Sequence, residues 1–162
     1  MSERILVAGV GNIFLGDDGF GVEVVRQLAA RPIPDGVQVA DIGIRGVHLA
    51  YELLDGCRLL VLVDAAARGE PPGTVTVLEV DPAGEPTGDP AAPVLDPHSM
   101  APDDVLALLR KLGSPPVRTL VVACEPADLT QGIDLSAPVR AAVPHAIRAV
   151  EAILARETAT AT

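Results

Sequence analysis

Two aspartates and one histidine are the residues whose types could meet a metal ion. Asp18 lies in a glycine-rich loop, Asp64 directly follows the most apolar run of the chain, and His98 lies in a proline-bound segment. Carboxylates combined with neutral imidazole suit nickel or zinc. A lone aspartate after a strand is more often a turn residue, however. The separations of 46 residues (18 to 64) and 34 residues (64 to 98) are too long for a local metal motif. Only the fold can bring these side chains together.

The loop that contains Asp18 also allows a second interpretation. An apolar run followed by Gly-x-Gly at 9–11 is how a dinucleotide-binding loop begins, with Asp41 as the ribose acid. The full fingerprint needs glycine where this chain has Phe14, and Asp17 and Asp18 stand where a pyrophosphate would bind. Because like charges repel, the loop suits a cation better, and dinucleotide binding is the weaker alternative.

Short apolar runs and stretches with helical spacing alternate along the chain. Runs rich in Val, Ile and Leu predict strands at 5–8, 37–41, 58–63, 75–80 and 119–123. Helical spacing predicts helices at 19–30, 47–54, 103–112 and from Ser136 to about Arg156, with Pro144 expected to kink or split the last one. Most of the runs are apolar on both faces, as a helix-covered sheet requires. The pattern predicts a three-layer α/β/α sandwich with a mixed, mostly parallel five-stranded sheet.

One connection departs from the alternation. Only nine residues separate Asp64 from Thr74, too few and too rich in proline for a crossover helix. The strand at 75–80 is therefore expected to run antiparallel to its neighbour. The segment 81–97 has no periodicity and is expected to be a long surface loop. We expect one domain over residues 1–157 and a disordered tail over 158–162.

Composition excludes several classes of function. The chain has 162 residues and a formal net charge of −10, which argues against nucleic acid or an anionic membrane as the main partner. Its one lysine, Lys111, lies in no P-loop motif. Cys57 and Cys124 form no C-x-x-C pair, no long apolar run occurs in the sequence, and we expect no targeting segment. We expect a cytoplasmic protein.

The motifs together resemble one family, the [NiFe]-hydrogenase maturation endopeptidases. The resemblance extends from about residue 4 to 156. It rests on the loop sequence Gly-Val-Gly-Asn-Ile-Phe-Leu-Gly-Asp-Asp-Gly-Phe-Gly at 9–21, on Val63-Asp64-Ala65, on Asp96-Pro97-His98, on the glycine-rich segment 41–46, and on Glu125-Pro126 with Leu135-Ser136-Ala137-Pro138.

The resemblance implies a protease that removes a C-terminal extension from the precursor of a hydrogenase large subunit after nickel insertion. By motif, the catalytic and nickel-contacting trio is Asp18, Asp64 and His98, with Asp17 as an additional metal contact. The family often has Glu where this chain has Asp18, so the side chain at this position is shorter by one methylene group. The precursor supplies the nickel, and other divalent ions are able to occupy the site. The free protein is expected to be a monomer. Whether the metal polarises the carbonyl or activates a water is left open.

Two further functions remain as alternatives. Cys124 follows an apolar run and could pair with His98 as a thiol nucleophile, although nothing around it marks an activated thiolate. A nickel-binding adaptor or chaperone that recognises the hydrogenase precursor without cutting it would also need the same trio.

Overall fold

The computed structural model describes residues 4–43, 56–80 and 118–159, and the fold is built on a five-stranded mixed sheet. The strands are β1 (Ile5–Val10), β2 (Val37–Gly43), β3 (Leu59–Ala65), β4 (Val75–Val80) and β5 (Thr119–Cys124). They lie in the order β2-β1-β3-β5-β4. All five predicted strands are confirmed, most with one or two more residues at an end than the apolar runs indicated.

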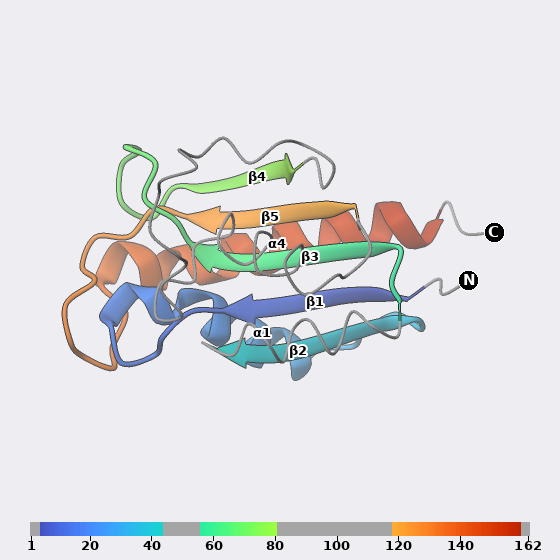
Figure 1. The fold of residues 1–162 in the computed structure, drawn as a ribbon, viewed down its shortest axis with the longest axis horizontal. Helices are drawn as coiled ribbons and strands as arrows, with labels where there is room; N and C mark the ends of the chain where they lie inside the picture. The colour runs from blue at the N-terminus through green and yellow to red at the C-terminus, as the bar shows by residue number, and fades with distance from the viewer. Residues whose placement is uncertain (1–3, 44–55, 81–117, 160–162) are drawn as a thin grey trace, which may run out of the picture.

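Strand direction follows the length of the connections. β1 is parallel to β2 and β3, and β3 is parallel to β5. β4 is antiparallel to β5, with Val77 opposite Val122, so the prediction for 75–80 is confirmed. Figure 1 shows the arrowheads of β1, β2, β3 and β5 pointing one way and that of β4 pointing back. The short link after β3 passes the end of β5, which enters the sheet between β3 and β4.

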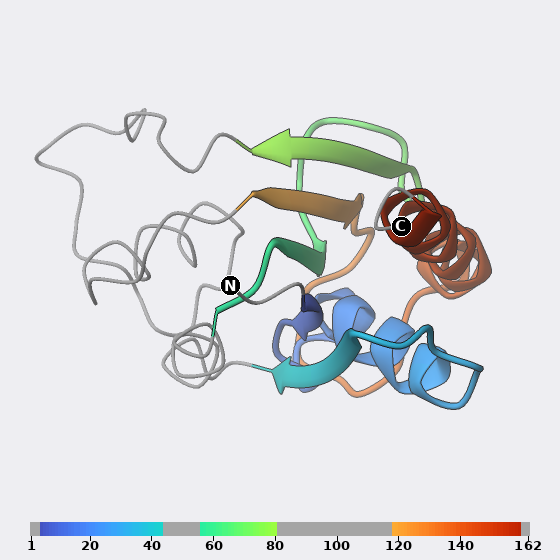
Figure 2. The ribbon, with the colours of Figure 1, turned by 90° about the vertical axis from the view of Figure 1, so that its right-hand side faces the viewer.

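Two helices cover one face of the sheet. They are α1 (Phe20–Ala29) and α4 (Ala137–Ala159), and a short 3-10 turn, η1 (Gly16–Gly19), precedes α1. Figure 2, with the molecule turned, shows α1 and α4 on the same side. Both contribute their apolar stripes to one core cluster with alternate residues of the strands. The helices predicted at 47–54 and 103–112 lie outside the described residues.

The opposite face of the sheet is equally apolar. It presents the other set of alternate side chains, all buried: Leu6, Ala8, Val10, Ile42, Leu60, Leu62, Val121 and Ala123. The expectation of strands that are apolar on both faces is thus confirmed for β1, β3 and β5, whose residues are almost all buried.

The last helix differs from its prediction in two respects. α4 continues past Pro144 as a single helix, so the proline does not split it. Pro144 and Arg140, whose carbonyl loses its helical partner, are both exposed, so water can satisfy that carbonyl. α4 also extends to Ala159, where Thr158 donates a hydrogen bond to the Leu154 carbonyl, so the helix includes the first two residues assigned to the tail.

Candidate active site

Two of the predicted site residues meet at the carboxyl ends of β1 and β3. Gly9, near the end of β1, lies opposite Val63, and Asp64 is the next residue of β3. Asp18 lies in η1, on the loop that leaves β1. In open α/β sheets this edge, where neighbouring connections diverge, is where ligands bind. His98 lies outside the described residues, so its position relative to the two aspartates stays a prediction.

Asp64 is a buried carboxylate without a well-placed hydrogen-bond donor among the residues that the structure describes. Its side chain is fully buried, and among the described residues no donor lies in hydrogen-bonding geometry with Oδ1 or Oδ2. Burial raises the pKa of Asp64 well above its ordinary value, and the nearby Asp18 carboxylate raises it further, while the Ala65 backbone opposes this weakly. An unpaired buried carboxylate is costly, so its presence points to a function other than stability.

Asp18 is the second carboxylate of this pair. It is half-buried, and its Oδ2 accepts a hydrogen bond of 2.7 Å from the Asn12 backbone N–H. Burial raises the pKa of Asp18, and the bond from Asn12 partly opposes the rise. Two close carboxylates cannot both ionise at low cost unless a cation lies near them. The site therefore has the donor chemistry of a cation contact.

Glycine 11 makes the approach of the two aspartates possible. Its φ of +132° is disfavoured for residues with a side chain, and a Cβ there would lie 1.9 Å from the Asp18 carbonyl oxygen and 3.5 Å from Asp64 Oδ1. Gly21, in the first turn of α1, is equally close to the strands, since a Cβ there would lie 2.0 Å from the Val63 carbonyl oxygen. Gly11 and Gly21 thus allow close packing within the protein, whereas the glycines of a dinucleotide-binding loop allow the backbone to approach a phosphate.

Asp17 uses its carboxylate to hold two distant segments of the chain together. Its Oδ2 accepts hydrogen bonds from the backbone N–H groups of Ala127 and Asp128 and from Ser136 Oγ, each 2.8 Å long. Its Oδ1 accepts a 2.7 Å bond from the Ser136 N–H, at the N-terminus of α4. Burial opposes ionisation, yet these four bonds together lower the pKa of Asp17. Its carboxylate also complements the α4 helix dipole.

We expect the Asp17→Asn variant to lose about 2–4 kcal/mol of unfolding free energy, because an amide cannot accept all four hydrogen bonds and brings donors of its own. Since the pKa of Asp17 is lowered in the folded state, its contribution is present above the ordinary aspartate pKa and is lost as pH falls through the folded value. Urea unfolding at neutral and acidic pH measures both effects. Asp35→Asn, at an exposed aspartate, is the control. Equal stability of Asp17→Asn and wild type would contradict the anchoring role.

Glu125 is a buried acid whose structural role the sequence did not reveal. It is buried directly after β5, and its carboxylate accepts hydrogen bonds from the backbone N–H groups of Arg68 and Glu70. These bonds fix the connection between β3 and β4, which begins two residues after Asp64. The sequence feature that could have identified Glu125 is an acidic residue directly after an apolar strand.

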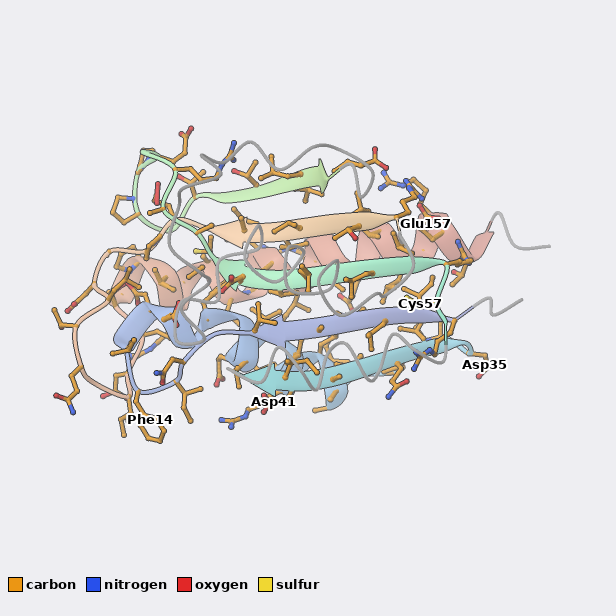
Figure 3. The ribbon with its side chains drawn as sticks, viewed as in Figure 1. Phe14, Asp35, Asp41, Cys57 and Glu157 are labelled. Carbon is orange, nitrogen blue, oxygen red and sulfur yellow. The ribbon has the colours of Figure 1, made fainter. Side chains whose placement is uncertain are left out.

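The thiol nucleophile and the dinucleotide site find no support in the geometry of the described residues. Burial raises the pKa of Cys124 to about 11, with Asp17 and Glu125 contributing, so its thiol stays protonated at neutral pH. Asp41, the candidate ribose acid, forms a 3.5 Å ion pair with Arg26. Figure 3 shows Asp41 at the end of β2.

A pocket of about 510 Å³ lies at the opposite edge of the sheet, at the amino ends of β1 and β2. Its two arginines are engaged: Arg4 donates to the Gly56 carbonyl, and Arg58 forms an ion pair with Glu157. The carboxylate pair does not line this pocket.

Among residues 4–43, 56–80 and 118–159, no group of three His, Cys, Asp or Glu side chains is placed to hold a metal. In the same ranges, no helix is long and apolar enough to cross a bilayer.

The fold and the carboxylate pair define an open α/β protein with a candidate site at the carboxyl ends of its parallel strands. Comparison with known proteins identifies the family. Residues 22–153 match the family model for hydrogenase maturation protease. The chain is 37% identical to the hydrogenase expression/formation protein HupD of Rhizobium leguminosarum bv. viciae, over 93% of this chain and 74% of that protein. It is 33% identical to the hydrogenase 2 maturation protease of Escherichia coli strain K12, over 93% and 90% of the two chains.

Solved structures agree. The hydrogenase maturating endopeptidase HybD from E. coli superposes with a TM-score of 0.76 at 34% identity, over 94% of this chain and 93% of that one. A hydrogenase 2 maturation peptidase from Thaumarchaeota archaeon SCGC_AB-539-E09 gives 0.69 at 32% identity, over 93% and 98%. This chain belongs to the hydrogenase maturation protease family and is an endopeptidase.

Proposed function

We propose that this protein cleaves the C-terminal extension from the precursor of a [NiFe]-hydrogenase large subunit once nickel has been inserted there. The observation that carries the proposal is the buried Asp64 carboxylate, which has no hydrogen-bond donor among the described residues and lies beside Asp18. Such a pair is stabilised when a cation arrives with the substrate. The similarity to the E. coli hydrogenase 2 maturation protease supports the same substrate class.

In this proposal nickel is part of the substrate, and Asp18, Asp64 and His98 contact it. The two carboxylates supply oxygen donors and His98 supplies the imidazole, a combination suited to nickel. The site then responds to metal loading, because the precursor without nickel leaves the two carboxylates in mutual repulsion. Contact with the metal also positions the scissile bond close to it. Asp17, whose oxygens already accept four hydrogen bonds, holds the loop that carries Asp18.

The reaction is the hydrolysis of one peptide bond. Water adds to the carbonyl carbon and the C–N bond breaks, which leaves a new carboxyl terminus on the large subunit and a free amino group on the released extension. The metal supplies electrophilic assistance, by polarising the carbonyl or by activating the water. The protein supplies the orientation of the metal-bearing segment and excludes bulk water around Asp64.

Incubation with nickel-loaded and nickel-free precursor tests the function. We expect intact-mass spectrometry to show loss of the extension only from the nickel-loaded precursor. Formation of a stable complex with no mass change would instead support the adaptor alternative. Cleavage of both precursors at equal rates would contradict recognition of nickel by the site.

A further inference from the structure

Three large apolar side chains are exposed on two loops at the carboxyl edge of the sheet. They are Phe14, 61% exposed, Leu129, 47% exposed, and Ile133, 75% exposed, and we call them the apolar loop patch. Phe14 is one of only three aromatic residues in the chain. Figure 3 shows it at the tip of its loop, directed away from the body of the protein. Large apolar groups gathered on one exposed surface mark interaction sites.

The two loops that carry this patch are bonded to each other. The Gly132 N–H donates to the Phe14 carbonyl at 2.9 Å, and the Gly16 N–H donates to the Gly132 carbonyl at 2.8 Å, which forms an isolated bridge between Leu15 and Gly132. The Asp17 N–H also donates to the Asp128 carbonyl at 2.9 Å. These backbone bonds hold the patch as a preformed surface, so a partner would bind it with little ordering cost.

The patch is continuous with the active site. Phe14 is four residues before Asp18 on the same loop, and the second loop is fixed by the Asp17 carboxylate. A molecule whose peptide bond lies near Asp18 and Asp64 therefore has its surface next to the patch. The short extension alone would not need a contact surface beyond the catalytic edge.

Charge around the patch distinguishes between occupants. Asp128 and Asp134 are exposed on the same loop, and hydrogen bonds from Thr130 lower the pKa of Asp128, so it stays ionised. A second copy of this chain, with its net charge of −10, would bring like charges together. A partner with apolar side chains ringed by lysine or arginine fits instead.

We propose that the apolar loop patch is the docking surface for the folded body of the hydrogenase large-subunit precursor, bound through an apolar area with a basic rim. This inference rests on the proposed function and adds where the precursor binds. Affinity for the precursor comes from Phe14, Leu129 and Ile133, and the response to nickel comes from the aspartates. Docking is therefore independent of whether the precursor carries nickel.

The test is a binding titration with the full-length protein and the uncleaved precursor, prepared with and without nickel. The triple variant Phe14→Ser, Leu129→Ser, Ile133→Ser is expected to bind both preparations at least about tenfold more weakly, because buried apolar anchors dominate interface affinity. With nickel-loaded precursor its KM rises by a similar factor, while kcat at saturation stays close to the wild-type value. Its thermal midpoint should match the wild type, since the three side chains are exposed.

Val77→Ser is the matched control, because Val77 is an apolar residue 44% exposed on the edge strand β4. It should leave the Kd and KM unchanged. Wild-type affinity of the triple variant, equal weakening by Val77→Ser, or failure of the wild type to bind either precursor would overturn the docking proposal. Binding without cleavage by the wild type, together with weak binding by the triple variant, would overturn the proposed function and keep the docking surface.

Discussion

Asp64→Asn is expected to abolish processing of the precursor while making the free protein more stable at neutral pH. The amide has nearly the shape of the carboxylate but cannot carry the charge that, in the proposed function, contacts the metal. Loss of one electrostatic contact to a reacting group lowers kcat by about 100-fold or more. The stability gain arises because Asp64 is fully buried, without a hydrogen-bond donor among the described residues, and beside Asp18.

The pH dependence of this gain has a defined sign. Burial and the Asp18 carboxylate raise the pKa of Asp64 in the folded state. The folded protein therefore binds more protons than the unfolded chain, and stability is lost as pH rises from the ordinary aspartate value through the folded pKa. Asp64→Asn removes this loss. Its thermal midpoint should exceed that of the wild type most at about pH 8 and least at about pH 4, close to the ordinary pKa of aspartate.

Asp41→Asn is the matched control for this experiment. Asp41 also lies near the carboxyl end of its strand, β2, but it is exposed and its partner is Arg26. The change should leave processing intact and alter stability by about 1 kcal/mol or less, as for other surface ion pairs. Normal processing by Asp64→Asn, or a lower midpoint than wild type at every pH, would contradict the role given to Asp64.

Gly11→Ala is expected to have the second largest effect. The added Cβ would lie 1.9 Å from the Asp18 carbonyl oxygen, so η1 must move and carry the Asp18 carboxylate away from Asp64. Steric overlap and the positive φ together should lower the unfolding free energy by about 2–4 kcal/mol. Processing should be lost at temperatures where the variant remains folded, as measured by circular dichroism and intact mass.

The Gly69→Ala variant separates the effect of steric overlap from the effect of the positive φ. Gly69 also has a positive φ, +78°, but a Cβ there would meet nothing within 4 Å. The Gly69→Ala variant should lose only the unfolding free energy that a positive φ costs a residue with a side chain, about 1–2 kcal/mol. It should process the precursor normally. A Gly11→Ala variant with the same stability and activity as Gly69→Ala would show that the close approach at Gly11 does not position Asp18.

The arrangement of the sheet was largely predictable because its signals are local. Buried strands are continuous apolar runs, and the nine-residue link after Asp64 is too short for a crossover helix, which required a reversed strand. The proline in α4 predicted a kink or a split, and the helix is not split. Its effect depends on whether the freed carbonyl faces water, as the exposed Arg140 and Pro144 indicate, and that depends on tertiary packing.

The site was predictable only in part. The sequence placed Asp18 and Asp64 at strand ends, and the parallel pairing of β1 with β3 brings them together. It could not separate Asp17 from Asp18, since adjacent aspartates have the same chemistry. The two aspartates differ in role because Ser136, which lies 119 residues away from Asp17 in the sequence, donates two hydrogen bonds to Asp17 and none to Asp18. The role of Glu125 likewise depends on a distant loop, and His98 stays a prediction.

The contact between Asp17 and Ser136 also sets the order in which the site can be completed. The loop that carries Asp18 is synthesised before α4, which is the last described element of the chain. Until α4 has formed and docked, Asp17 lacks the donors at Ser136, and two of the four hydrogen bonds to its carboxylate are missing. A nascent chain therefore holds both aspartates of the pair before it holds the helix that completes the hydrogen bonds of Asp17, so we expect the loop to reach its full stability only when α4 has docked.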